Sequence, residues 1–171
     1  KVVQYLLVGF QVIVLVWLSV AAYLHVADGT AFEGLHMDPD WFNPLSVDSF
    51  STFAAGVSLS VFIYWGWDVV LTLNEESTDG ANTPGRSALA TILVIVALYL
   101  MVALAVLMYS GVSSEGVGLG NPEIQENVFA ALAGPIMGPT AVLMSIAVLS
   151  SSAASLQSTM ISPARTLLAM G

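Results

Sequence analysis

The residues with the clearest chemical potential form one short stretch, Tyr64-Trp65-Gly66-Trp67-Asp68, inside an apolar run that ends at Glu75 and Glu76. Gly weakens a helix by about 1 kcal/mol relative to Ala, and an ionised Asp inside a bilayer costs about 3 kcal/mol or more. One interpretation is a kinked membrane span in which Asp68 pairs with a neighbouring helix. The interpretation that we favour is a broken helix, whose freed backbone groups line a polar cavity.

A second set of polar side chains forms a serine stripe near the end of the chain. Ser151, Ser155, Ser158 and Ser162 follow at spacings of four, three and four residues, which places them on one helix face. Small residues at that period allow close helix packing. Alternatively, the hydroxyl of Ser151, Ser152 or Ser155 coordinates an ion or a substrate.

The composition indicates a membrane protein. Of the 171 residues, 57% are hydrophobic and 9% are charged, and the mean hydropathy is +0.85. Soluble chains carry about 25% charged residues. The formal net charge of −9 argues against a nucleic-acid partner, which needs a basic surface. Because the chain has no Cys, disulfides, thiolate metal sites and thiol catalysis are excluded.

Four apolar runs are long enough to cross a bilayer, at about residues 2–26, 50–74, 87–109 and 139–168. A hydrocarbon core about 30 Å thick needs about 20 apolar residues in a helix. We therefore expect an all-α transmembrane fold with four spanning helices, the second of them broken at mid-membrane. Asp48 or Ser49 can cap that second span.

The last long loop is expected to contain a short extracellular helix of its own, at about residues 122–133. Asn121 would cap it, Pro122 would occupy its first position, and Gly134-Pro135 would stop it. The two histidines, His25 and His36, lie at or near a loop boundary. A lone His there is usually a solvated polar residue, so neither is assigned to a metal.

The cations predict the orientation of the spans. Four spans place Lys1, Arg86 and Arg165 on one side, which the positive-inside tendency makes cytoplasmic. The predicted location is the cell membrane, with residues 1, 75–86 and 165–171 in the cytoplasm. The side opposite then carries most of the acids: Asp28, Glu33, Asp38, Asp40, Asp48, Glu115, Glu123 and Glu126.

Three segments together resemble the amino acid–polyamine–organocation (APC) superfamily of permeases. The first is Phe62-Ile63-Tyr64-Trp65-Gly66-Trp67-Asp68 with the following Glu75-Glu76, and the second is Thr83-Pro84-Gly85-Arg86-Ser87-Ala88. The third is the Arg-containing end of the last predicted span, Ser162–Gly171. The resemblance covers the whole chain, and its most specific part is the segment of the second span.

The resemblance implies a transporter with a five-plus-five inverted repeat, of which this chain supplies the fifth to eighth transmembrane helices. Carried over by position, Tyr64, Trp65, Gly66 and Trp67 would be an unwound segment whose carbonyls meet a substrate amino group. Phe62 would close over the substrate, and Ile63 and Asp68 flank the segment. The broken first helix of the family is absent, so remaining helices of a parent chain would complete the site. We expect this chain to be a piece of a larger protein.

The same resemblance bears on coupling. Some proton-coupled relatives carry a Lys in the middle of the fifth helix, where this chain has Gln11, which does not titrate near neutral pH. Sodium-coupled relatives use hydroxyls of the eighth helix, which Ser152 and Ser155 could supply, with Ser151 beside them. The coupling ion, a proton or sodium, stays open, and no other cofactor is expected.

The sequence thus predicts a secondary active transporter for amino acids or related amines, embedded in the lipid bilayer. The alternative is a membrane-embedded structural or sensory subunit without transport activity, which binds a partner through its serine-rich face. No enzymatic or catalytic residue is expected, because Asp68 within its span has no visible acid or base partner.

Overall fold

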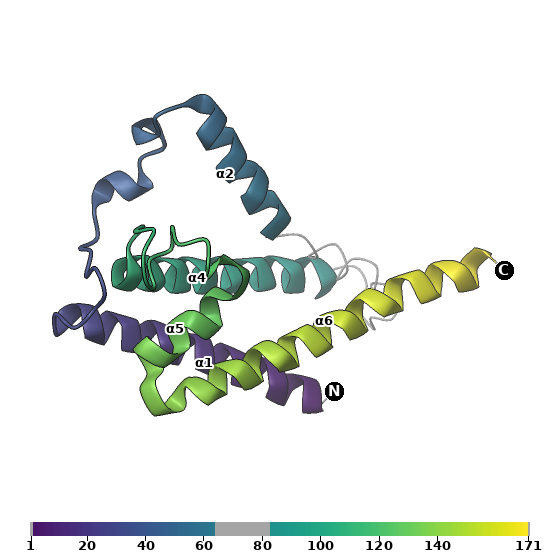
Figure 1. The fold of residues 1–171 in the computed structure, drawn as a ribbon. Helices are drawn as coiled ribbons and strands as arrows, with labels where there is room; N and C mark the ends of the chain where they lie inside the picture. The colour runs from purple at the N-terminus through teal and green to yellow at the C-terminus, as the bar shows by residue number, and fades with distance from the viewer. Residues whose placement is uncertain (1, 64–82, 171) are drawn as a thin grey trace. The chain divides into compact units, whose positions relative to one another are not determined.

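The computed structural model describes residues 2–63 and 83–170, with side chains over 2–63 and 85–156 (Figure 1). Every regular element in these ranges is a helix, so the all-α prediction is confirmed for the described part of the chain. The chain divides into two compact units. One combines Lys1–Leu35 with Met101–Gly171, and the other is His36–Leu100.

Three stretches of the described residues are long and apolar enough to cross a membrane: Val2–Ala27, Gly85–Ser110 and Gln125–Leu156. They indicate a membrane protein, as the composition predicted. The predicted second span, 50–74, is described only over helix α2, Phe50–Ile63, which has 14 residues. Its predicted break at 64–67 lies outside the described residues.

Helix α1, Val2–Ala27, presents one apolar seam to the rest of the first unit. Val14, Leu18, Ala21 and Ala22 are buried, and Leu18 is 0% exposed. Gln11, Leu18 and His25 follow one another at intervals of seven residues, which brings them back to nearly the same side of a helix after two turns each. The seam therefore carries a polar side chain at each end and a fully buried Leu in its middle.

The seam of α1 packs against helices α5, Val128–Met137, and α6, Ala141–Met170, which also contact each other. A 3-10 turn, η5 at Gly138–Thr140, joins α5 to α6. The cluster buries Leu132 and Ile136 of α5 together with Met144 and Ala147 of α6. These three helices form the main core of the first unit, and Figure 1 shows α6 reversing direction after α5.

The short loop helix differs from its predicted bounds of about 122–133. A 3-10 turn, η4, covers Gln125–Asn127, and α5 then begins at Val128 with Asn127, not Asn121, as its N-cap. The Asn127 side chain accepts from the backbone N–H of Ala130 at 3.2 Å. The helix also continues through Gly134-Pro135 to Met137 with Pro135 inside it, so the predicted stop at these residues is wrong.

Asn121 has a different structural role from the predicted cap. Its side chain is 7% exposed, donates to the carbonyl of Gly116 at 2.7 Å and accepts from the N–H of Glu123 at 3.0 Å. The surrounding loop makes its own turns, with Leu119 N–H bonded to the Gly111 carbonyl at 3.1 Å and Gly120 N–H to that of Ser113 at 3.0 Å. Asn121 therefore holds a compact loop and does not start a helix.

Helix α4, Thr83–Ser110, ends against the loop that follows α1. The N–H of Glu33 donates to the carbonyl of Tyr109 at 3.1 Å, and that of Leu35 donates to Met108 at 2.8 Å. The last carbonyls of a helix have no partner within it, so these bonds cap α4 from another segment. Gly111, at φ +64°, turns the chain away after the helix.

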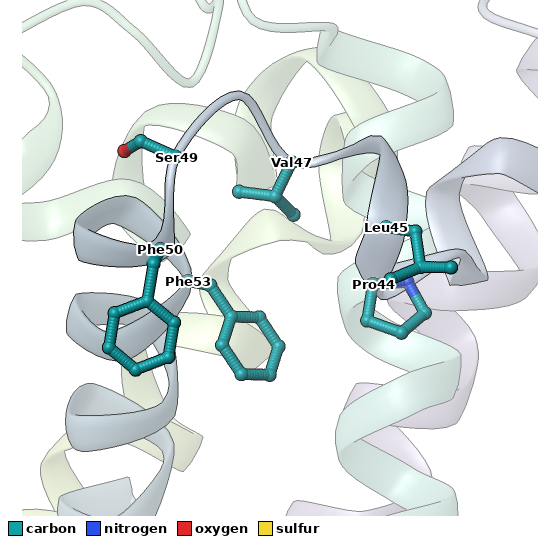
Figure 2. Close-up of a pocket in the computed structure, with 6 residues that line it drawn as sticks. All are labelled: Pro44, Leu45, Val47, Ser49, Phe50 and Phe53. Carbon is teal, nitrogen blue, oxygen red and sulfur yellow. The ribbon is translucent and has the colours of Figure 1, made fainter.

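In the second unit, two 3-10 turns precede α2: η1 at Pro39–Phe42 and η2 at Pro44–Ser46. Ser49, one of the two predicted caps, accepts from the N–H of Thr52 at 3.2 Å at the start of α2. Figure 2 shows the shallow apolar hollow of about 310 Å³ that this segment forms; it is lined by Pro44, Leu45, Val47, Ser49, Phe50 and Phe53. The hollow contains none of the predicted site residues.

Candidate functional site

The candidate site is a polar pair that joins α1 and α6. Nε2 of Gln11 donates a hydrogen bond of 3.1 Å to Oγ of Ser150. Ser150 in turn donates to the carbonyl of Ala147, one turn earlier on α6, at 2.9 Å. Both side chains are partly buried. One hydrogen bond thus joins two long apolar helices, and the second ties the Ser150 hydroxyl to the backbone of its own helix.

The packing of the two helices explains why these two residues meet. Trp17 donates from Nε1 to Oγ1 of Thr140 at 3.1 Å, while Gln11, nearer the start of α1, reaches Ser150, further along α6. A later residue of α1 therefore contacts an earlier residue of α6, which shows that the two helices are antiparallel. Met144 and Ala147 of α6 lie between the two polar contacts in sequence. Both are buried in the cluster that also contains the apolar seam of α1.

Gln11 was one of the predicted ion-coupling residues, but its partner was not among them. Ser151, Ser152 and Ser155 are all exposed in the described chain. Ser152 donates to the carbonyl of Val148 within its own helix at 2.9 Å. The structure thus brings Gln11 to the serine-rich part of α6 but pairs it with Ser150. Adjacent residues of a helix point in directions about 100° apart. The sequence pattern did not show which of the adjacent serines would face α1.

The predicted substrate-binding residues are described only in part. Phe62 and Ile63 are the last described residues of α2, and their side chains are 66% and 57% exposed. Tyr64, Trp65, Gly66, Trp67 and Asp68 lie outside the described residues. The proposed wall of the substrate site therefore remains a prediction.

The structure also assigns contacts to a residue that the sequence analysis set aside. His25 is partly buried: Nε2 lies 3.2 Å from the carbonyl oxygen of Ile136, and Nδ1 lies 2.7 Å from Oγ1 of Thr30. Its ring meets that of Tyr109 edge to face at a centroid distance of 5.7 Å. The expectation of a simply solvated His25 is wrong, although its spacing of seven residues from buried Leu18 was a visible signal.

These polar contacts do not gather into a metal site. Across the described residues, no three His, Asp or Glu side chains come together in a way that could hold a metal ion. The chemistry that the pair Gln11–Ser150 offers is that of neutral hydrogen-bonding groups, an amide and a hydroxyl. Such groups can bind a cation through oxygen atoms or hold two helices in register.

Comparison with known proteins adds no family assignment: no family model, no curated protein and no solved structure matches this chain. The APC resemblance consequently stays a prediction from the motifs of the sequence.

Proposed function

We propose that this chain forms part of a secondary transporter for amino acids or related amines, working by alternating access around a break at 64–67. The proposal adopts the APC resemblance. The chain supplies the fifth to eighth helices of a five-plus-five inverted repeat in the cell membrane, and further helices of a parent chain complete the substrate site. Residues 1, 75–86 and 165–171 face the cytoplasm.

The observation that supports this proposal is the hydrogen bond between Gln11 and Ser150. Polar side chains within membrane spans are uncommon and often mark ion or substrate pathways. The resemblance implies coupling residues on the fifth and eighth helices, and α1 and α6 are the two helices in those positions. Their polar residues meet, which agrees with a coupling site between them.

Uptake into liposomes tests the proposal. The parent protein, purified and reconstituted, is expected to show saturable uptake of at least one radiolabelled amino acid or amine. The present chain alone is expected to show none, because lipid cannot satisfy the backbone groups freed by a helix break. A parent that transports no member of a full amino acid and polyamine panel would overturn the proposal.

Binding by a Phe62→Ala variant of the parent tests the substrate wall separately. Phe62 is expected to cover the substrate, so its loss should weaken binding by about 1–3 kcal/mol, or about fivefold to 150-fold. Phe50→Ala is the matched control, since Phe50 lies on the same helix and is 83% exposed. Equal affinity in both variants, or a loss that only follows unfolding, would assign Phe62 to packing.

A structural or sensory subunit is the second candidate, and one observation favours it. Ser151, Ser152 and Ser155 are exposed on α6, and small residues on a membrane helix allow a partner helix to approach closely. Replacing Ser151 and Ser155 together by Leu should release a bound partner if this candidate is correct. The same replacement in a transporter should lower uptake without changing which proteins copurify.

A further inference from the structure

We propose that the two 3-10 turns before α2, η1 and η2, rest in the headgroup region of the bilayer, on a leaflet of neutral, zwitterionic lipid. Leu45 and Phe50 contact lipid there, while the carboxylates beside them stay in water. This binding surface belongs to the second unit alone and does not depend on the transport proposal. It is indicated by outward apolar side chains, by backbone groups that bond within the turns and by the local charge.

The turns and the start of α2 present large apolar side chains to the outside. Leu45 is 90% exposed, Phe50 is 83% exposed, and Phe42 is exposed as well. Figure 2 shows Phe50 and Phe53 on one side of the shallow apolar hollow and Pro44 and Leu45 on the other. An exposed apolar patch of this kind is typical of a surface that contacts a protein or a membrane.

Helix α2 places this patch at the edge of a bilayer. No residue from 50 to 63 is charged, and the exposed side chains of Val57 and Leu59 lie on opposite sides of the helix. The hydroxyls of Ser58 and Ser60 donate to carbonyls of their own helix, at 2.8 and 2.9 Å. A helix that is apolar all round is buried in a protein or in a membrane. The start of a membrane helix lies at the membrane–water interface, where aromatic side chains are enriched.

The backbone of the two turns is bonded within the segment. The side chain of Asp38 accepts from the N–H of Asp40 at 3.0 Å, and that of Asn43 accepts from the N–H of Leu45 at 3.0 Å. The N–H of Asn43 itself donates to the carbonyl of Asp40 at 3.1 Å. These groups lose no hydrogen bond when water leaves, so the turns can lie where water is scarce.

The charges of the segment favour neutral lipid as the partner. Residues 36–63 contain three acids and no Lys or Arg, and all three acids are exposed: Asp38, Asp40 and Asp48. An anionic lipid surface attracts basic segments and therefore repels this one. A protein partner would have to desolvate carboxylates for which the segment offers no cation. On a zwitterionic surface the carboxylates remain hydrated while the apolar side chains reach the lipid.

Photo-crosslinking in the full-length parent protein tests the proposal, because every helix that could cover the patch is then present. An amino acid with a diazirine side chain replaces Leu45 or Phe50, one at a time. The matched control is Glu115, an exposed residue of the loop after α4. After illumination in phosphatidylcholine nanodiscs, mass spectrometry identifies the attached molecule. We expect phospholipid adducts at positions 45 and 50 and the product of water at position 115.

Nanodiscs made of equal parts phosphatidylcholine and phosphatidylserine test the preference for neutral lipid. The lipid adduct at position 45 should decrease about fivefold, the factor expected for one unit charge near an anionic surface. Replacing the three acids together, Asp38→Asn, Asp40→Asn and Asp48→Asn, should remove this difference.

Position 45 decides the outcome if the probe at Phe50 disturbs the start of α2, because the Leu45 side chain is almost fully exposed. A crosslink from position 45 to another segment of the parent would overturn the proposal, and so would the product of water alone. Equal adduct yields in the two lipid compositions would overturn it as well.

Discussion

Gln11 and Ser150 lie 139 residues apart in the sequence and are joined by a 3.1 Å hydrogen bond from Nε2 to Oγ. The bond joins the two apolar helices α1 and α6. Trp17 and Thr140 provide a second polar contact between the same helices. The α1–α6 pair thus has a defined rotation and register, which apolar packing alone would specify less strictly.

The energetic coupling of this pair can be measured with a double-mutant cycle of Gln11→Leu and Ser150→Ala. We expect a coupling of about 0.6 kcal/mol and at most about 1.7 kcal/mol, the range found for hydrogen bonds between membrane helices. The free energy of unfolding in mixed micelles is the measurement. A parallel cycle of Gln11→Leu with Ser152→Ala should give no coupling, because Ser152 bonds to the backbone of its own helix.

Leu18→Ala is expected to destabilise the first unit by about 2–4 kcal/mol, since it opens a cavity at a fully buried position. Leu24→Ala, on the same helix but at a side chain that is 55% exposed, should cost much less. Unfolding of the two variants under identical conditions provides the comparison. Similar losses in both would show that the seam described for α1 is not its packing face.

Gly120→Ala tests the compact loop that Asn121 holds. A Cβ at residue 120 would lie 2.5 Å from the carbonyl oxygen of Val112 and 3.0 Å from that of Ser113. Because both neighbours are backbone atoms, the loop must shift, and we expect a loss of about 1–3 kcal/mol. Gly9→Ala is the control: nothing lies within 4 Å of its Cβ, and Ala favours a helix over Gly by about 1 kcal/mol.

The predicted orientation can be tested by labelling single cysteines, since the chain has none of its own. Cysteines placed at Glu33 and Glu123 should react with a membrane-impermeant reagent in intact cells, and a cysteine at Arg86 should react only after lysis. Labelling at position 86 in intact cells would contradict both the orientation and the number of spans. Unlabelled positions 33 and 123 would do the same.

For the described residues, local sequence patterns were sufficient to predict two of the long apolar helices. Runs such as 2–26 and 87–109 contain too many consecutive apolar residues to be loops, and they form α1 and α4 in the structure. The start of α2 was also predictable, because Ser49 satisfies an N–H group of the first turn locally. Local hydrogen bonding and local hydrophobicity need no knowledge of distant residues.

The loop helix shows where local signals compete. Asn121 and Asn127 are both suitable caps by residue type, and Pro122 favoured the first of them. The structure uses Asn127, because Asn121 is buried in its loop and bonded to Gly116. The choice of Asn127 as the cap thus depended on the loop contacts of Asn121, which the sequence pattern does not show.

The partners of the polar side chains, in contrast, are set by tertiary packing. Ser150, Ser151 and Ser152 are the same residue type and are adjacent in sequence. The rotation of α6 against α1 brings Ser150, and not its neighbours, to Gln11. Likewise, His25 contacts the ends of α4 and α5, which lie more than 80 residues away in the sequence. A helix pattern specifies which residues share a face. The identity of the group opposite that face is set by packing between segments that the chain brings together only when it folds.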